Sequence, residues 1–274
     1  MNKSLASPSL WKPDLSISQT QTAPSKQGAF EIKFLVDKSL VEKLIPAVAA
    51  RMQLDPHADP QTGGYSVEGI YFETLERDVY RRTPGYSRRK YRIRRYSQGS
   101  NVFLERKSKR KGIVTKRRLQ LKTSDLAAIL NRTYNGTWSL SVADHSNESS
   151  GPTEMNWFLK RIDRLKLQPT LCIAYDRVAF LQMENLGPIR LTIDRGLECC
   201  LLNQSHFPCK SDYQSILEGK CIVELKYREA LPTVFQEFIE KFKLMSQPVS
   251  KFRNAIAEAE IVTPPDCVSS KGIR

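Results

Sequence analysis

The segment from Arg81 to Lys122 constrains the fold more than any other part of the chain. It contains 17 lysines and arginines and a single acidic residue, Glu105, while the whole chain carries a formal net charge of +14. The rest of the chain is therefore close to neutral, and the positive charge is concentrated in one place. Such a concentration predicts a polyanion or a highly charged small anion as the partner.

The basic segment divides into three strands at about 88–96, 102–109 and 112–121, with turn signals between them. Successive side chains of a strand point to opposite faces, so Lys90, Arg92 and Arg94 form one row against Tyr91 and Ile93. A charged row on a single strand is usually a solvated face. Rows of this kind on nearly every strand, mostly basic with single carboxylates, instead favour a closed barrel with the charged rows inside.

The remaining pattern predicts five further strands, five helices and two tails. We expect strands at 29–36, 65–74, 170–181, 188–194 and 221–228, and helices at 38–53, 123–131, 154–167, 233–245 and 250–260, with 197–220 irregular. Asp37 is the expected N-cap of the first helix, and Pro46 is expected to kink or break it. The predicted fold class is α+β: an antiparallel, eight-stranded β tunnel barrel with a basic lumen and helices packed outside.

The predicted domain spans 28–260, with a flexible insertion at 132–152, a disordered N-terminal tail at 1–27 and a C-terminal tail at 261–274. No apolar stretch approaches the ~18 residues of a membrane-spanning helix, and the first residues have no signal-peptide core, so the predicted location is cytoplasmic. Cys200, Cys209 and His206 do not follow a common zinc-ligand spacing, and reduced thiols are the better interpretation.

Short motifs in a fixed order resemble the VTC (vacuolar transporter chaperone) domain, the polyphosphate polymerase branch of the triphosphate tunnel metalloenzymes. Each motif alone is weak, but eight in the family's order form a specific signal over about residues 28–260. They are Phe30-Glu31-Ile32-Lys33-Phe34, Tyr71-Phe72-Glu73-Thr74, Tyr91-Arg92-Ile93-Arg94-Arg95-Tyr96, Phe103-Leu104-Glu105-Arg106-Lys107, Tyr175-Asp176-Arg177-Val178-Ala179-Phe180, Arg190-Leu191-Thr192-Ile193-Asp194, Val223-Glu224-Leu225-Lys226 and Ser250-Lys251-Phe252.

The resemblance implies a metal-dependent phosphotransferase that moves the γ-phosphoryl group of ATP onto a growing polyphosphate chain inside the tunnel, using Mn²⁺ or Mg²⁺. The implied metal ligands are Glu224, with Glu31 and Glu105 as helpers, and Ser250, Lys251 and Lys33 would lie at the reacting phosphate. The implied ligands of the triphosphate and polyphosphate are Lys33, Arg81, Arg92, Arg94, Lys107, Lys116, Arg118, Tyr175, Arg177, Arg190 and Lys226. Such chemistry needs alignment and charge stabilisation rather than a protein base.

The chain departs from the family pattern at Ala29, where the wider superfamily begins an alternating Glu-x-Glu-x-Lys motif. The eukaryotic polymerases are also coupled to membrane-embedded and phosphate-sensing domains, which are not expected here. The resemblance therefore implies that translocation is not a property of this chain, and it leaves open an unidentified membrane partner.

Two alternative functions stay open at this level. One is a hydrolase of triphosphate or polyphosphate with the same fold, although water-directed chemistry ordinarily needs a positioned base. The other is a non-catalytic module that binds polyphosphate or nucleic acid through the basic strands. Specific nucleic-acid binding is not expected, because Glu31, Glu105 and Glu224 share the basic rows and would repel a polynucleotide.

Overall fold

The structure is a computed structural model that describes residues 29–87, 89–97, 99, 101–110, 113–122, 126, 129–130, 151–185, 187–202 and 206–262. The predicted tail at 1–27, most of the predicted tail at 261–274, most of the short helix predicted at 123–131 and nearly all of the insertion predicted at 132–152 lie outside these residues. None of the helices in the described ranges is long and apolar enough to cross a membrane.

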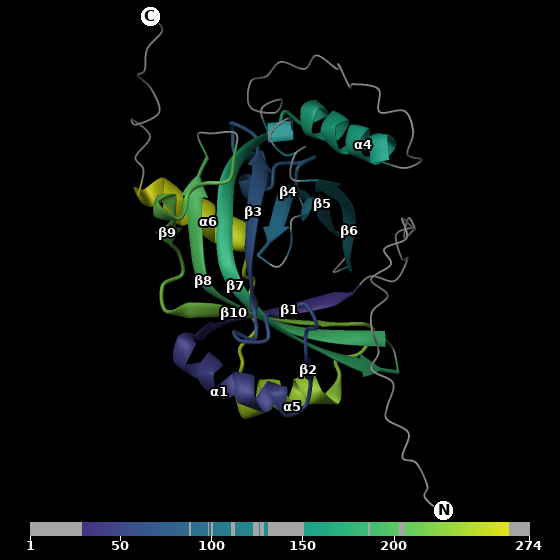
Figure 1. Cartoon of the computed structure of the whole chain (residues 1–274), viewed down its shortest axis with the longest axis vertical. Coiled ribbons are helices and arrows are strands. Elements are labelled where there is room, and N and C mark those ends of the chain that lie inside the picture. Colours follow the sequence, from purple (N-terminus) through teal and green to yellow (C-terminus); the bar gives the residue numbers. More distant parts are fainter. Residues whose placement is uncertain are drawn as a thin grey trace, which may run out of the picture.

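The described part of the chain is a large antiparallel sheet with helices packed on it (Figure 1). The strands are β1 Phe30–Asp37, β2 Gln53–Leu54, β3 Tyr65–Glu73, β4 Arg89–Tyr96, β5 Asn101–Arg110, β6 Ile113–Lys122, β7 Gln168–Glu184, β8 Gly187–Leu201, β9 Gln214–Ser215 and β10 Lys220–Tyr227. The helices are α1 Lys38–Ala49, α2 Asp78–Arg81, α4 Gly151–Arg164, α5 Thr233–Lys241 and α6 Lys251–Val262, with a 3-10 turn at Lys210–Asp212.

Eight of these strands form one path in the order β1-β10-β8-β7-β3-β4-β5-β6, and they are the eight that the alternation predicts. The expectation of a closed eight-stranded barrel is corrected in two respects, because β2 and β9 extend the sheet to ten strands and the sheet is not closed by a ladder. Its two ends, β1 and β6, meet at an isolated bridge between Ala29 and Val114. A second bridge, from Phe34 to Ser246, lies farther along β1.

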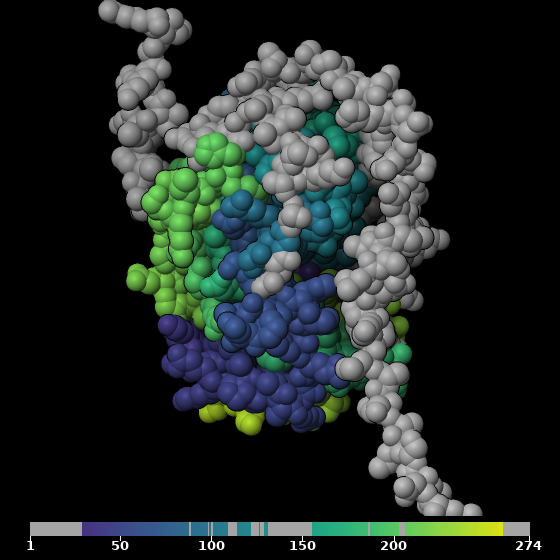
Figure 2. Space-filling view, in the orientation of Figure 1, coloured from purple at the N-terminus to yellow at the C-terminus, as the bar shows by residue number. Residues whose placement is uncertain are grey.

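Apolar rows face outward on these strands and are covered by helices. On β1, β7, β8 and β10 they pack under α1 and α5 in a cluster that includes Phe34, Leu44 and Phe235. In the space-filling view, the purple α1 and the yellow-green α5 lie together at the base of the molecule (Figure 2). Apolar and polar residues alternate along these strands because only the outward face of the sheet is buried under helices.

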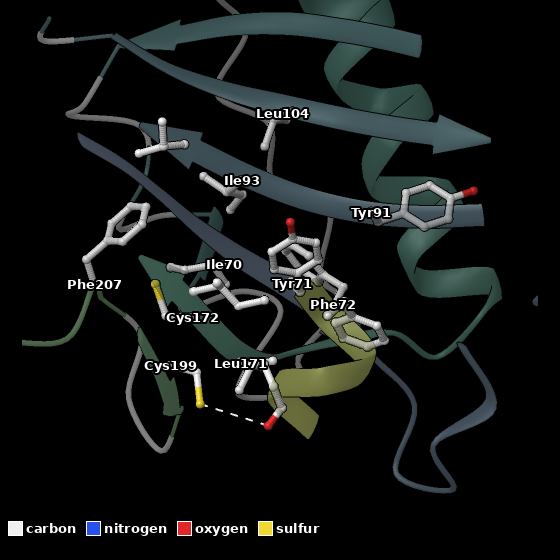
Figure 3. Packing of buried hydrophobic residues seen from close by; sticks show 14 of the residues in the cluster. Ile70, Tyr71, Phe72, Tyr91, Ile93, Leu104, Leu171, Cys172, Cys199 and Phe207 are labelled. Atoms are coloured by element: carbon white, nitrogen blue, oxygen red, sulfur yellow. Dashed lines mark hydrogen bonds between the residues drawn. The ribbon is translucent and has the colours of Figure 1, made fainter. Parts of the chain in front are cut away.

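A second cluster lies at the other end of the sheet, where Ile70, Ile93 and Leu104 come from β3, β4 and β5 (Figure 3). Helix α4 packs on this outer surface, with Phe158 edge-on to both Phe72 and Tyr91 at 6.2 and 5.7 Å between ring centroids. Helix α6 packs instead against β7 and β8, where its Ala255 carbonyl accepts from the Cys199 thiol. Cys199 is the cross-strand partner of Ile173, which lies on the same row of β7 as Tyr175 and Arg177, so α6 covers one end of the inner face.

Several local predictions differ from the structure. Asp37 precedes α1 but makes no side-chain cap, because its carboxylate pairs with Lys220 at 2.7 Å, and Pro46 is accommodated within a helix that ends at Ala49. The segment predicted as irregular contains the end of β8 and all of β9. The unpredicted helix α2 begins where the buried Glu73 carboxylate accepts the backbone N–H groups of Thr74, Val79 and Tyr80, each at 2.8 Å.

Candidate functional site

The inward rows of the sheet enclose a cavity of about 1100 Å³ whose lining is dominated by cations. Two glutamates, Glu31 and Glu224, also line it. The lining cations are Lys33, Arg82, Arg89, Lys90, Arg92, Arg94, Lys107, Lys116, Arg118, Arg177, Arg190, Lys226, Lys251 and Arg253. They come from seven strands, the residue after α2 and the first turn of α6, so the fold gathers charges that are far apart in the sequence.

The structure places most of the predicted site residues in this lining. The register explains how, because cross-strand neighbours lie on the same face of a sheet. On β1, β10 and β8, Glu224 lies between its cross-strand neighbours Lys33 and Thr192. On β4, β5 and β6, Glu105 lies in the same way between Arg92 and Arg118. The predicted residues in the lining are Lys33, Arg92, Arg94, Lys107, Lys116, Arg118, Tyr175, Arg177, Arg190, Lys226, Ser250, Lys251, Glu31 and Glu224.

Arg81 lies outside the lining, and its role as a phosphate ligand stays a prediction. Arg81, the last residue of α2, and its neighbour Arg82 are both exposed, but only Arg82 lines the cavity. Arg82 has a left-handed backbone with φ of 62° and ends the helix. The short helix and this turn decide which of two adjacent arginines faces inward, and alternation along a strand does not apply to them.

Glu105 is the second predicted residue that the structure places differently. Its carboxylate is fully buried beneath the lining, and it pairs with Arg92 at 2.6 Å, with Lys116 at 2.5 Å and with Arg118 at 3.1 Å. Burial alone would raise the pKa of Glu105, but these cations outweigh it and hold the pKa well below its usual range. Glu105 is therefore an ionised counter-charge for the basic rows, and both of its oxygens lie within ion-pair distance of cations.

Asp194 is a buried carboxylate that belongs to one of the eight motifs but is not among the predicted site residues. It accepts two hydrogen bonds from Arg177, at 2.6 and 2.8 Å, and forms an ion pair with Lys251 at the first residue of α6. Burial opposes ionisation, yet Arg177 and Lys251 lower the pKa of Asp194 to about 2. The row of Arg190, Thr192 and Asp194 was the available signal, since all three share the inward face of β8.

Four tyrosines of the described residues, Tyr65, Tyr71, Tyr96 and Tyr175, place their hydroxyl groups among the lining cations, and Tyr96 accepts from Arg118 at 3.0 Å. Tyr71 accepts from Arg92 at 3.0 Å, Tyr175 accepts from Arg94 at 3.1 Å and Tyr65 accepts from Arg190 at 2.8 Å. Burial would raise the pKa of Tyr71, but Arg92, Arg94 and Lys251 together lower it to about 7. The Tyr71 hydroxyl therefore titrates near neutral pH, a property that no sequence pattern indicated.

The carboxylates in the lining have the chemistry of a site for a hard divalent cation. Glu224 forms an ion pair with Lys33, and Glu31 with Lys107 at 2.9 Å. Although burial opposes it, Lys33 and Lys107 keep the pKa of Glu224 well below its ordinary value, so Glu224 is an oxygen ligand in its ionised form. No group of three or more His, Cys, Asp or Glu converges within the described ranges. One or two carboxylates completed by substrate phosphates is the usual way proteins hold Mg²⁺, so Glu224 and Glu31 fit such an ion.

The arrangement is suited to binding a chain of phosphates. Guanidinium groups contact phosphate oxygens in pairs, ammonium groups act as point charges, and the start of α6 adds backbone N–H donors. Four lining cations are not among the predicted site residues: Arg82, Arg89, Lys90 and Arg253. For Lys90 the signal was present in the charged row with Arg92 and Arg94, whereas the others depend on the packing of α2, β4 and α6.

Comparison with known proteins gives a family match and several similar structures. The model of the VTC domain matches residues 29–259. No curated protein is similar enough to the chain to count as a match. Among solved structures, a proposed adenylate cyclase from Bacillus halodurans has 13% identity and a TM-score of 0.49, over 82% of this chain and 94% of that chain. A proposed adenylyl cyclase from Hippeastrum, described as having a dominant triphosphatase activity, has 13% identity and a TM-score of 0.48, over 84% and 96% of the two chains.

The family match spans almost the whole described part of the chain, including every lining residue of the cavity. It confirms the resemblance that the eight motifs indicated. The chain therefore belongs to the VTC domain family.

Proposed function

We propose that the chain is an ATP-dependent polyphosphate polymerase, in which the cavity binds the triphosphate of ATP and a polyphosphate chain. The observation that carries the proposal is the convergence of lysines and arginines from seven strands and α6 on one cavity of about 1100 Å³. A single surface patch would serve a nucleic acid equally well, but a recessed cavity lined from seven strands favours a narrow, flexible polyanion.

The reaction needs little covalent help from the protein. A terminal phosphate oxygen of the chain attacks the γ-phosphorus of ATP, the bond from that phosphorus to the β–γ bridging oxygen breaks, and ADP leaves with the oxygen. The acceptor oxygen is already ionised near neutral pH, so no base has to remove a proton. Lysines and arginines align the two phosphates and stabilise charge on the transferred group.

Lys251 and Arg177 are the residues best placed to act on the transferred group. Both are held by Asp194, and Lys251 also lies over the Tyr175 ring at 4.8 Å from its centroid. This support fixes the position of the ammonium group before substrate binds. A Mn²⁺ or Mg²⁺ ion held by Glu224 and Glu31 would supply neutralisation of the phosphate oxygens when bound.

A hydrolase is the second candidate, and Tyr71 is the observation that favours it. Its lowered pKa near 7 provides a lining group that can accept a proton from an attacking water. The two lining carboxylates are less suited to that role, because each is bound by a lysine.

One product analysis separates these functions. Purified protein is incubated with ATP and Mn²⁺ or Mg²⁺, and products are resolved on a polyacrylamide gel before and after digestion with a polyphosphatase. The proposal expects a ladder that the polyphosphatase removes, together with stoichiometric ADP, and no ladder from Lys251→Ala. Release of orthophosphate without polymer would establish the hydrolase, and ATP binding without turnover would establish a binding module.

A further inference from the structure

Apart from the exposed Lys226, which has no ion pair among the described residues, the lining cations of the cavity fall into two groups according to their ion pairs. In the first group each cation has a carboxylate partner within ion-pair distance. The pairs are Lys33 with Glu224, Lys107 with Glu31, Arg177 and Lys251 with Asp194, Arg190 with Asp55, and Arg92, Arg94, Lys116 and Arg118 with Glu105. In this part of the cavity, the positive charge is therefore largely balanced by protein carboxylates before any ligand binds.

The second group consists of Arg82, Arg89, Lys90 and Arg253, which we call the mouth cluster. Among the residues that the structure describes, none of the four has a carboxylate within ion-pair distance. They occupy one corner of the cavity, since Arg82 follows α2, Arg89 and Lys90 begin β4, and Arg253 is in the first turn of α6. The Arg253 guanidinium lies over the ring of Tyr80 on α2, at 5.1 Å from its centroid, so these elements meet there.

Lys90 is the most deeply placed member of the mouth cluster. Its ammonium group donates to the Ser250 hydroxyl oxygen at 2.7 Å and lies 5.4 Å from the centroid of the Phe252 ring. Burial lowers the pKa of Lys90 to about 8, the Tyr71 hydroxyl opposes the shift, and the nearby cations Lys107, Lys33 and Arg92 add to it. A buried ammonium group without a counter-charge is destabilised, and an anion that enters the corner removes that penalty.

Ser250 connects the two groups of cations. Its oxygen accepts from Lys90 and also from the backbone N–H of Arg253, at 3.3 Å, as the N-cap of α6. Both acceptor positions of the hydroxyl are then used, which leaves its own proton to be donated into the cavity. The next residue, Lys251, belongs to the first group through Asp194. A phosphate at Ser250 would therefore lie at the boundary between the compensated region and the mouth cluster.

We propose that the mouth cluster is a subsite for the polyphosphate acceptor chain, separate from the subsite of the ATP triphosphate. The inference rests on the proposed polymerase function and adds the location of its second substrate. Carboxylates in the first region provide ligands for the divalent ion that accompanies ATP, and they would repel a chain without metal. The mouth cluster offers only positive charge and hydrogen-bond donors, which matches a chain that carries about one negative charge on each phosphate.

The test compares binding of the two ligands by variants that neutralise the cluster. Arg82→Gln with Arg253→Gln removes two charges at the rim, and Lys90→Met removes the buried one. The matched control, Lys43→Gln with Lys210→Gln, removes two exposed charges elsewhere. Calorimetric Kd values are measured for a medium-chain inorganic polyphosphate without divalent metal and for ATP with Mg²⁺. We expect both cluster variants to bind polyphosphate at least about tenfold more weakly, the size of one lost charge-assisted hydrogen bond, with the Kd for ATP changed less than about twofold.

Other outcomes have distinct meanings. Equal losses for ATP and polyphosphate would assign the cluster to the triphosphate subsite and overturn the proposal, as would unchanged binding of both ligands by the rim double variant. The failure of the polymerase function is recognised separately: wild-type protein would then bind polyphosphate through the cluster but make no polymer from ATP. If polymer is made, the cluster variants are expected to show a raised KM for added polyphosphate acceptor and an unchanged KM for ATP.

Discussion

Lys251, the first residue of α6, forms an ion pair with Asp194, a fully buried carboxylate on β8. The same carboxylate accepts both hydrogen bonds from Arg177 on β7. Two cations that face the cavity are thus held by one acidic residue beneath them. The first prediction follows from this shared counter-charge.

Asp194→Asn is expected to lower the free energy of unfolding by about 3–5 kcal/mol at pH 7, because it leaves two buried cations without their partner. The folded state lowers the pKa of Asp194 from 3.8 to about 2, so this stabilisation is present above pH 3.8 and is lost as the pH falls toward 2. Urea unfolding of both proteins between pH 7 and pH 2 measures the difference. Asp37→Asn is the control, because the exposed pair of Asp37 with Lys220 contributes at most about 1 kcal/mol.

Glu224→Gln is expected to change the metal requirement of the protein, whereas Glu105→Gln is expected to change its stability. In Glu224→Gln, the loss of the carboxylate that lines the cavity is expected to raise the metal concentration for half-maximal activity by at least about tenfold. In Glu105→Gln, the loss of the buried carboxylate is expected to leave that concentration unchanged and to lower the free energy of unfolding. Titration of activity with Mn²⁺ and thermal unfolding of each variant separate the two effects. A metal requirement altered equally by both variants would contradict the placement of Glu105 beneath the lining.

Tyr71→Phe is expected to flatten the pH dependence of ligand binding. Since the pKa of Tyr71 is lowered to about 7, its phenolate adds a negative charge to the cavity above that pH and weakens binding of a polyanion. The Kd of the wild type for tripolyphosphate is therefore expected to rise between pH 6 and pH 8. The fold increase in the wild type should exceed the fold increase in Tyr71→Phe by a factor of up to about ten. In Tyr65→Phe the pH dependence should persist, because burial raises the pKa of Tyr65. Identical profiles for wild type and Tyr71→Phe would contradict the prediction.

Gly64→Ala is expected to disturb the cavity from outside it. A Cβ atom at Gly64 would lie 2.7 Å from the backbone carbonyl oxygen of Arg177, so β7 has to shift. We expect a loss of about 1–3 kcal/mol in stability and weaker tripolyphosphate binding as the Arg177 guanidinium moves. Gly69→Ala is the matched control on β3, where the nearest atom would be 3.5 Å from the new Cβ atom. Comparable losses in both variants would show that the effect is not specific to the Arg177 contact.

The inward rows were predictable from sequence because alternation is a local property of each strand. Lys90, Arg92 and Arg94 had to share a face wherever the sheet placed them. The counter-charges were not predictable in the same way, since Arg190 pairs with Asp55, 135 positions away, and Arg177 with Asp194 on the adjacent strand. Burial of Glu105 depends on the strands on both sides of it. The orientation of Arg82 rather than Arg81 depends on a helix of four residues, which gives no periodic signal.

The incomplete closure of the sheet has a consequence for the behaviour of the protein at high concentration. An open sheet normally exposes edge strands that can pair with other molecules and aggregate. Here Val114 bridges Ala29, the residue before β1, and in the middle of β1 the carbonyl oxygen of Lys33 accepts from the backbone N–H of Gln247 at 3.0 Å. The other edge, β6, carries the exposed Lys116 and Arg118. One edge is thus covered and the other is charged, so the tunnel wall can stay open along a seam without becoming a template for fibril growth.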